Sequence, residues 1–310
     1  MSKLAWAPLT EGSGTIVGPD GQVLARYDWR RANHPYFDQL RALTHAGVLT
    51  NHAPHDHRWH HGLWWSWKFV NDVLFWEDHP EYGGNRIGLG RSIVTDHAVS
   101  EINGTVVIHE QLAWQAVSTG EKLLHEERHI VGAVDQTEPD RWLLDWDQTW
   151  TAEVPVLFES TPWPATSWGG YGGLNYRPAR SMAAGETILG AGLDGASALH
   201  GARSPWASYT GLVDGAETDE PRLPARGGVA LLQHPGNPRY PDPVYSFSAD
   251  DGFGFLSTAP LMHEPLSLDV SEAMRIRTRV VVLGEPTDEN ALAAAHHSFV
   301  EDQQTQPSPL

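Results

Sequence analysis

The chain of 310 residues contains no cysteine. Disulfide bonds, thiolate metal ligands and a cysteine nucleophile are therefore excluded, and this composition suits a reducing compartment. The sequence also has no run of 18 apolar residues, so we expect no membrane-spanning helix. Its first residues, MSKLAWAPLTEGSG, lack the apolar segment of a secretory signal, which favours a cytoplasmic location.

Positive charge is scarce in this sequence. Lys and Arg total 21 against 39 Asp and Glu, which gives a formal net charge of −18. A surface this acidic repels phosphate backbones and anionic lipids, so we expect neither a nucleic-acid nor a membrane partner. Hydrophobic residues make up 40% of the chain, enough for a sizeable core.

Alternation with a period of two residues is the dominant pattern. In Trp142–Thr151 the tryptophans at 142, 146 and 150 share one face, and Asp145 and Asp147 share the other. Further strands are predicted at Thr105–Trp114, Lys122–Val131, Gly228–Gln233, Gly254–Thr258 and Ile276–Leu283. Short intervals rich in Gly, Pro, Asn and Asp separate these runs, which is typical of antiparallel sandwiches and barrels.

Helical periodicity is convincing only in Thr287–Val300, where Leu292, Ala295 and Phe299 are spaced for one helix face. We therefore predict an all-β chain, a large antiparallel β-sandwich, with one C-terminal helix near residues 288–300. No repeat, charge block or linker divides the sequence, so residues 1–302 are predicted to form a single domain. The polar tail 303–310 is expected to be frayed.

Histidine is concentrated in one segment. Residues 52–61 contain five histidines, and five tryptophans follow between Trp59 and Trp76. On a helix, His57, His60 and His61 would lie together; on a strand, His61 would instead share a face with His57 and His55. Pro54 and Asp56 favour a loop at the start, so the sequence secures neither arrangement.

Imidazole groups in such a segment can perform three kinds of chemistry. They act as general acid or base, ligate a divalent metal while Asp56 orients a ring, or hydrogen-bond a ligand hydroxyl. A divalent metal is thus a possible cofactor, although no spacing typical of a metal motif fixes it. Satisfied histidines under aromatic packing are the structural alternative.

Several sequence blocks resemble the bacterial family DUF6807, sometimes labelled PmoA-like. They are NHPYF at 33–37, DHRWHHGL at 56–63, the pairs 70–71 and 75–76, GGYGGL at 169–174, PWASYT at 205–210 and HPGNPRYP at 234–241. The resemblance runs from Arg31 to Gly284, and DHRWHHGL and HPGNPRYP are its specific blocks. Asp72 stands where the family usually has Gly.

The segment from Pro265 to Gly284 also resembles the last strands of galactose-mutarotase-type β-sandwiches. That resemblance implies a supersandwich that binds sugars on a broad sheet and uses His and carboxylates as acid and base. Members of the family are, by the same resemblance, often found beside sugar oxidoreductases and sugar isomerases. A small-molecule carbohydrate is therefore the expected ligand.

Candidate site residues follow from these patterns. His57 and His60 are the predicted acid/base groups or ligands, and Asp56 and His61 are predicted to orient them. The predicted substrate-binding residues are those with sugar-stacking rings, a guanidinium fork or polar groups beside a strand end: Trp64, Asn71, Trp76, Arg128, Trp168, Tyr171, His234, Asn237, Arg239, His263 and Glu264. His57, His60 and Arg239 are expected to line one pocket.

Three functions remain open at this point. The favoured one is a carbohydrate-active enzyme using His acid/base chemistry, with or without metal assistance, on a sugar, keto-sugar or glycoside: a lyase, hydrolase or epimerase. The first alternative is a carbohydrate-binding or sensing protein without catalysis. The second is a cupin-like metal oxygenase, in which His57, His60 or His61 and Glu77 would form the facial triad of ligands.

Overall fold

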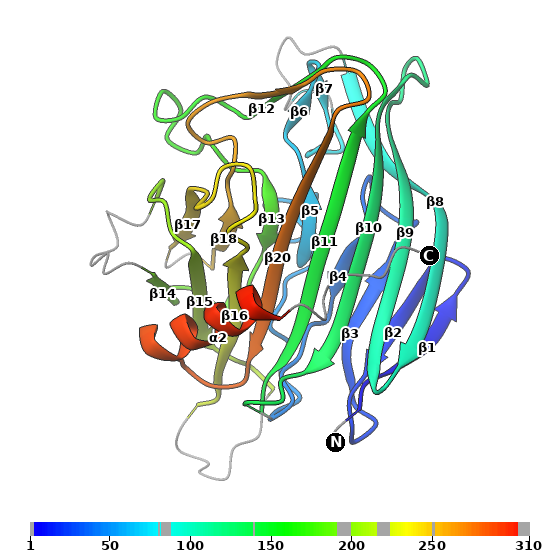
Figure 1. The fold of residues 1–310 in the computed structure, drawn as a ribbon. Helices are drawn as coiled ribbons and strands as arrows, with labels where there is room; N and C mark the ends of the chain where they lie inside the picture. The colour runs from blue at the N-terminus through cyan, green and yellow to red at the C-terminus, as the bar shows by residue number, and fades with distance from the viewer. Residues whose placement is uncertain are drawn as a thin grey trace.

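A computed structural model describes residues 3–79, 81, 88–138, 140–190, 200–215, 224–249 and 252–302. In this structure two β-sheets pack face to face, and the long strands β8, β9, β10, β11 and β20 stand side by side (Figure 1). The predicted all-β sandwich is therefore confirmed. The predicted frayed tail, 303–310, lies outside the described residues.

The first sheet has eight strands. In spatial order they are Ala5–Thr10 (β1), Ser13–Val17 (β2), Val23–Asp28 (β3), Tyr36–Asp38 (β4), Leu63–Ser66 (β5), Gly173–Tyr176 (β13), Gly254–Thr258 (β18) and Val244–Ser248 (β17). Every neighbouring pair is antiparallel.

The second sheet has twelve strands. In spatial order they are Glu186–Leu189 (β14), Trp206–Leu212 (β15), Arg226–Gln233 (β16), Ala273–Leu283 (β20), Trp142–Ala152 (β11), Lys122–Val134 (β10), Thr105–Ala116 (β9), Gly88–Ile102 (β8), Val73–Leu74 (β7), Phe69–Val70 (β6), Val156–Glu159 (β12) and Leu266–Leu268 (β19). Its pairs are antiparallel except β7 with β8, which run parallel.

Alternation decides which side chains enter the core between the sheets. On β11 the even-numbered side chains, among them Trp146 and Trp150, are buried there against residues of the first sheet such as Trp65. The odd-numbered side chains face away from the core and carry Asp145 and Asp147. Each sheet therefore has an inner side, which faces the core, and an outer side, which faces away from it. Polar groups are found on the outer sides of both sheets.

The C-terminal helix α2 spans Glu289–Glu301, which confirms its predicted position. Asp288 caps it by accepting a hydrogen bond from Ala291 N at 2.8 Å. Leu292 and Phe299 pack on the outer side of β16 and β20, so α2 covers that part of the second sheet (Figure 1). No helix in the described ranges is long and apolar enough to cross a bilayer.

Asn71 and Asp72 form the two-residue turn between β6 and β7. Their φ angles are 50° and 63°, the positive values of a turn that suits the twist of a hairpin. Glycine adopts such angles without strain. Asp is tolerated there, and the hairpin forms.

Candidate active site on the outer side of the first sheet

Aromatic side chains cover the outer side of the first sheet. Leu63 and Trp65 of β5 point into the core, whereas Trp64 points to the opposite side. Phe255 of β18 and Tyr245 of β17 point to that same side. We call this surface the aromatic face; its buried members are Tyr36, Trp64, Phe69, Leu74, Trp76, Tyr245, Phe255, Ala259 and Met262.

Two consecutive turns fold the histidine segment onto the aromatic face. His57 N–H donates to the carbonyl of Pro54 at 3.1 Å, and His60 N–H donates to the carbonyl of His57 at 3.0 Å. The segment is therefore neither the helix nor the strand considered above. These turns stack the rings of His57 and His60 with their centroids 4.8 Å apart.

His60 is the most deeply placed member of the segment. Its ring is 4% exposed and lies 5.2 Å from the ring of Trp64 and 5.1 Å from that of Phe255. Burial lowers the pKa of His60 well below its usual value, and the charges of Arg177 and Lys68 act in the same direction. The imidazole is thus neutral, and its buried Nδ1 has no hydrogen-bond partner among the described residues.

Asp56 anchors the segment from its exposed side. Its carboxylate contacts His57 Nδ1 at 2.9 Å, Arg177 at 2.9 Å and Arg180 at 2.7 Å. Burial alone would raise the pKa of Asp56, but His57 and Arg177 lower it well below its usual range. Asp56 is therefore ionised and holds the ring of His57, and its orienting role in catalysis stays a prediction.

His61 pairs with His52 at the base of the loop. Their Nδ1 atoms lie 3.4 Å apart, and both rings stack on Tyr36. Burial, followed by the charge of His52, lowers the pKa of His61 to about 3. His61 thus closes the loop, and its contacts are with His52, Tyr36 and His34 rather than with the stacked pair.

A buried polar group lies beside the tryptophans of the aromatic face. Lys68 Nζ bonds to Glu77 Oε1, and it donates to Tyr171 Oη at 2.8 Å. Tyr171 Oη is also 3.3 Å from Glu77 Oε1, and the Tyr171 ring lies 4.7 Å from that of Trp76. Glu77 Oε2 is buried without a hydrogen-bond partner in the part of the chain that the structure describes.

Burial shapes the ionisation of this group. It raises the pKa of Glu77 against the opposing effect of Lys68, and it raises the pKa of Tyr171 well above its usual value. Sequence reasoning had not selected Lys68. The signal was available, because a lysine inside the apolar run Trp64–Val70 must be buried with a counter-ion.

The exposed end of the aromatic face carries three of the other predicted residues. Trp168 is 56% exposed and stacks on Tyr171 at 6.5 Å. His263 lies 5.4 Å from Trp163 and bonds through Nε2 to the carbonyl of Gly201 at 3.0 Å. Trp168, Tyr171 and His263 thus extend the aromatic surface outward from Trp76, whereas Glu264 is exposed beside them.

Two predicted substrate contacts have structural surroundings instead. The side chain of Asn71 accepts a hydrogen bond from Leu157 N of β12 at 2.8 Å and donates one to the carbonyl of Pro155, directly before β12, at 2.9 Å. Arg128 lies fully buried between the sheets and bonds to Glu126 Oε1 at 2.7 Å. Neither contact involves the histidine segment.

The block HPGNPRYP divides between two places. His234 and Asn237 bond to Arg277 of β20, at 2.8 Å through the guanidinium and at 2.9 Å through the carbonyl. Arg239 instead donates to the carbonyls of Pro260, Glu264 and Pro265. It therefore reaches the aromatic face only through the loop that carries Met262 and His263, and its pocket with His60 stays a prediction.

Metal-ligand geometry is found elsewhere than predicted. Within the described ranges, the one group of three side chains placed to share an ion is His109, Glu127 and His129, on β9 and β10. His57, His60, His61 and Glu77 do not form such a group among these residues. The geometry therefore gives no support to the facial triad of the oxygenase alternative.

The fold and the site define an all-β sandwich with an aromatic, histidine-rich outer face. Residues 15–297 match the sequence model of DUF6807, described as a family of unknown function, so the chain belongs to that family. None of the curated proteins matches the chain in sequence. A solved structure of a putative aldose 1-epimerase from Klebsiella pneumoniae is similar over 97% of this chain and 84% of its own, with 10% identity and a TM-score of 0.40.

Proposed function

We propose that the aromatic face binds a carbohydrate and catalyses acid/base chemistry on it. The single observation that supports this best is the buried group Lys68, Glu77 and Tyr171, which the ring of Trp76 joins to His60. Ionisable groups are rarely buried together, and where they gather behind a binding surface they are candidates for catalysis.

Aromatic rings with hydrogen-bonding groups between them suit the ligand class. A sugar ring presents an apolar face of C–H groups, which packs on indole or phenol rings, and hydroxyls at its edge. Trp168 offers an exposed indole, and Trp59 and Trp163 are partly exposed around the buried centre. The neutral imidazole of His60 and the phenol of Tyr171 supply an acceptor and a donor for hydroxyls.

The ionisation states support acid/base roles. Burial keeps His60 neutral and able to accept a proton, whereas burial raises the pKa of Tyr171, so that its phenol stays protonated and can donate one. Environments that push pKa values in different directions are how one site provides both an acid and a base near pH 7. Proton abstraction next to a sugar carbonyl, or attack at the anomeric carbon with proton transfer to the departing oxygen, needs this combination.

Carbohydrate binding without turnover is the second candidate. The observation that favours it is the burial of Lys68 and Glu77, whose side chains are only 1% and 4% exposed. An ion pair that buried is also suited to fixing the shape of a binding surface. Measurements of binding and turnover on the same variants separate the two functions.

The test uses a panel of aldoses, uronic acids, keto-sugars and methyl glycosides. Binding is followed by tryptophan fluorescence, and turnover by proton NMR in D₂O, where abstraction of a C–H proton replaces the signal with deuterium. We expect His60→Gln to lower turnover by about 10²–10⁴-fold, the usual contribution of a general acid or base. Trp168→Ala should weaken affinity by about tenfold while the unfolding free energy changes by less than about 0.5 kcal/mol.

Leu212→Ala is the matched control, because Leu212 is a 43% exposed apolar side chain on β15. Its affinity and turnover should equal those of the unmodified protein. Saturable binding without turnover of any sugar would favour the second candidate. A large fall in melting temperature for His60→Gln with affinity and turnover preserved would make the histidine segment architectural and refute the proposal.

A further inference from the structure

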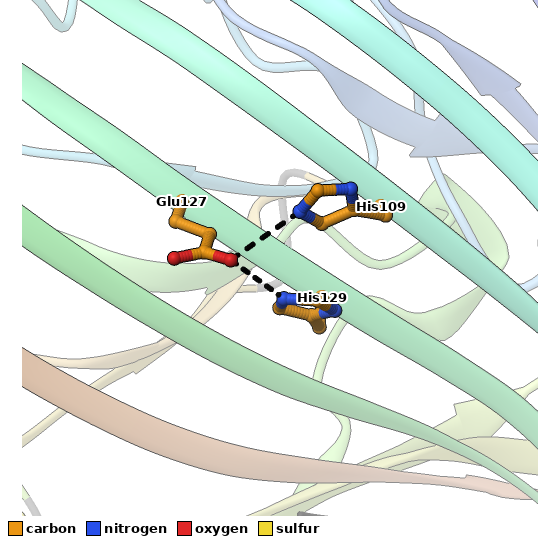
Figure 2. A group of neighbouring side chains, drawn as sticks. All are labelled: His109, Glu127 and His129. Atoms are coloured by element: carbon orange, nitrogen blue, oxygen red, sulfur yellow. Dashed lines mark hydrogen bonds and ion pairs between the residues drawn. The ribbon is translucent and has the colours of Figure 1, made fainter. Parts of the chain in front are cut away.

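Three polar side chains converge on the outer side of the second sheet. His129 and Glu127 are two positions apart on β10, and His109 is the residue directly opposite His129 on β9. Because side chains alternate along a strand and the neighbouring positions are buried, all three point away from the core. Figure 2 shows them grouped on β9 and β10. Positions i and i+2 of one strand with the cross-strand neighbour of one of them form a triangle of adjacent side chains.

The three groups turn their ligand atoms toward one another. Glu127 Oε1 lies 3.4 Å from His109 Nε2 and 3.2 Å from His129 Nε2 (Figure 2). All three ligand atoms lie within 4.8 Å of one another, and the imidazole rings stack with centroids 4.4 Å apart. Both Nε2 atoms therefore face the same carboxylate oxygen.

From this geometry we infer that His109, Glu127 and His129 form a binding site for a divalent metal cation such as Zn²⁺. The two contacts are longer than the roughly 2.7–2.9 Å of a charge-assisted N–H···O bond. Around a tetrahedral zinc ion, bonds of about 2.0–2.2 Å place two ligand atoms roughly 3.3–3.6 Å apart. The contact of His109 lies within that range at 3.4 Å, and the contact of His129 is slightly shorter at 3.2 Å. Two imidazoles and one carboxylate are a known donor set for zinc, with water in the fourth position.

The surroundings favour a cation at this place. The side chains of His109, His129 and Glu127 are 28%, 21% and 51% exposed, so an ion can enter from solvent and retain a water ligand. The chain carries a net charge of −18, which concentrates cations at its surface. Arg275, a positive charge that interacts with Glu127, is already engaged by Asp147 through its Nε and one terminal nitrogen.

This site is separate from the aromatic face. The outward side chains of β9 and β10 and the aromatic face lie on opposite outer sides of the sandwich, with the core between the sheets separating them. A bound ion would join β9 to β10 on a face that α2 leaves uncovered. The inference therefore stands independently of the proposed carbohydrate function.

The test measures Zn²⁺ binding to the metal-free full chain by titration calorimetry. We expect one tight site per chain, with affinity lowered at least about 100-fold in His109→Ala and His129→Ala, and about 10–100-fold in Glu127→Gln. Zn²⁺ should raise the melting temperature of the unmodified protein but not that of His129→Ala. Without metal, the three variants should unfold like the unmodified protein, because the positions are at the surface.

Two control variants exclude other histidines. His297→Ala removes an imidazole that is 73% exposed and 3.2 Å from Glu301, and His52→Ala removes one member of the His52–His61 pair. Both should bind Zn²⁺ like the unmodified protein. The inference fails if the unmodified protein shows no saturable Zn²⁺ binding at micromolar concentrations, or if His52→Ala or His297→Ala abolishes binding while His109→Ala and His129→Ala retain it.

Discussion

Lys68 and Glu77 form an ion pair whose two side chains are 1% and 4% exposed. The hairpin β6–β7 brings them together, since Lys68 precedes its first strand and Glu77 follows its second, and Phe75 N–H donates to the carbonyl of Lys68 at 3.1 Å. Taking two charges out of water is costly, and their mutual attraction offsets that cost only while both are present. The stability of this corner of the aromatic face thus depends on the pair.

Replacing Lys68 by Met should lower the free energy of unfolding by about 3–5 kcal/mol, because it leaves a buried carboxylate without its counter-ion. The double variant Lys68→Met, Glu77→Leu should recover a large part of that loss, since no uncompensated charge remains. Urea unfolding of the four proteins of this cycle measures both effects. Equal stability of the single and double variants would contradict the assignment.

The exposed pair Arg30–Glu11 is the matched control. Its side chains are 59% and 88% exposed, so solvent screens the attraction between them. Arg30→Met should change the free energy of unfolding by less than about 1 kcal/mol. A comparable loss in Arg30→Met and Lys68→Met would show that burial is not the cause.

Strands with one buried side were predictable from the sequence. The predicted strand Trp142–Thr151 is β11, Trp142–Ala152, because tryptophans on one side and polar groups on the other give a clear period of two. Strand β8, Gly88–Ile102, was not predicted, since many of its side chains are exposed on both sides and leave no apolar alternation. The short strands β5 to β7 are buried on both sides, which equally removes the signal.

The candidate site was predictable only in part. The density of histidines located the loop that carries His57 and His60, but Phe255, which packs on His60, is 195 positions away and reaches it only through the sheet pairing. Asn71 was selected because it lies in one of the blocks that resemble the family, and the structure gives it a positive φ and a hydrogen bond to β12. Such a block marks backbone geometry as readily as ligand contact.

The contribution of Asp242 to stability should fall as the pH rises from about 4 to about 7. Burial raises the pKa of this carboxyl to about 7, although Arg203 and Arg239 oppose the shift. Below both pKa values the group is protonated in the folded and unfolded chains and contributes no difference. Between them the unfolded chain releases its proton while the folded chain retains it, so the unfolded state gains stability, on the order of 4 kcal/mol in total.

Asp242→Asn removes this titration. We expect the difference in unfolding free energy between Asp242→Asn and the unmodified protein to shift in favour of the variant as the pH rises through that window. Guanidinium unfolding at a series of pH values measures it, and taking the difference cancels the other titrating groups. A difference that stays constant from pH 4 to pH 8 would mean that Asp242 titrates as an ordinary exposed carboxyl.

Arg239 should act on the aromatic face by holding the loop 260–265. Its guanidinium donates to three backbone carbonyls, those of Pro260, Glu264 and Pro265, which a single ammonium group cannot span. We expect Arg239→Ala to lower the free energy of unfolding by about 2–4 kcal/mol, given roughly 1.5–3 kcal/mol for a hydrogen bond from a charged group, and Arg239→Lys to recover only part of it.

Amide hydrogen exchange distinguishes this positioning role from a general loss of stability. In Arg239→Ala, exchange should accelerate at Ala259 and Met262, whose N–H groups donate to the carbonyls of Pro243 and Ala259 in the intact loop. The comparison variant is Arg203→Ala, because Arg203 donates to the carbonyls of Arg239 and Pro241 in the same region without touching the loop. If both variants accelerate exchange equally at Ala259 and Met262, or if neither does, Arg239 does not position the loop. If only Arg239→Ala does, sugar affinity should fall in that variant alone, since Met262 and His263 would leave the surface on which Trp163 and Trp168 lie.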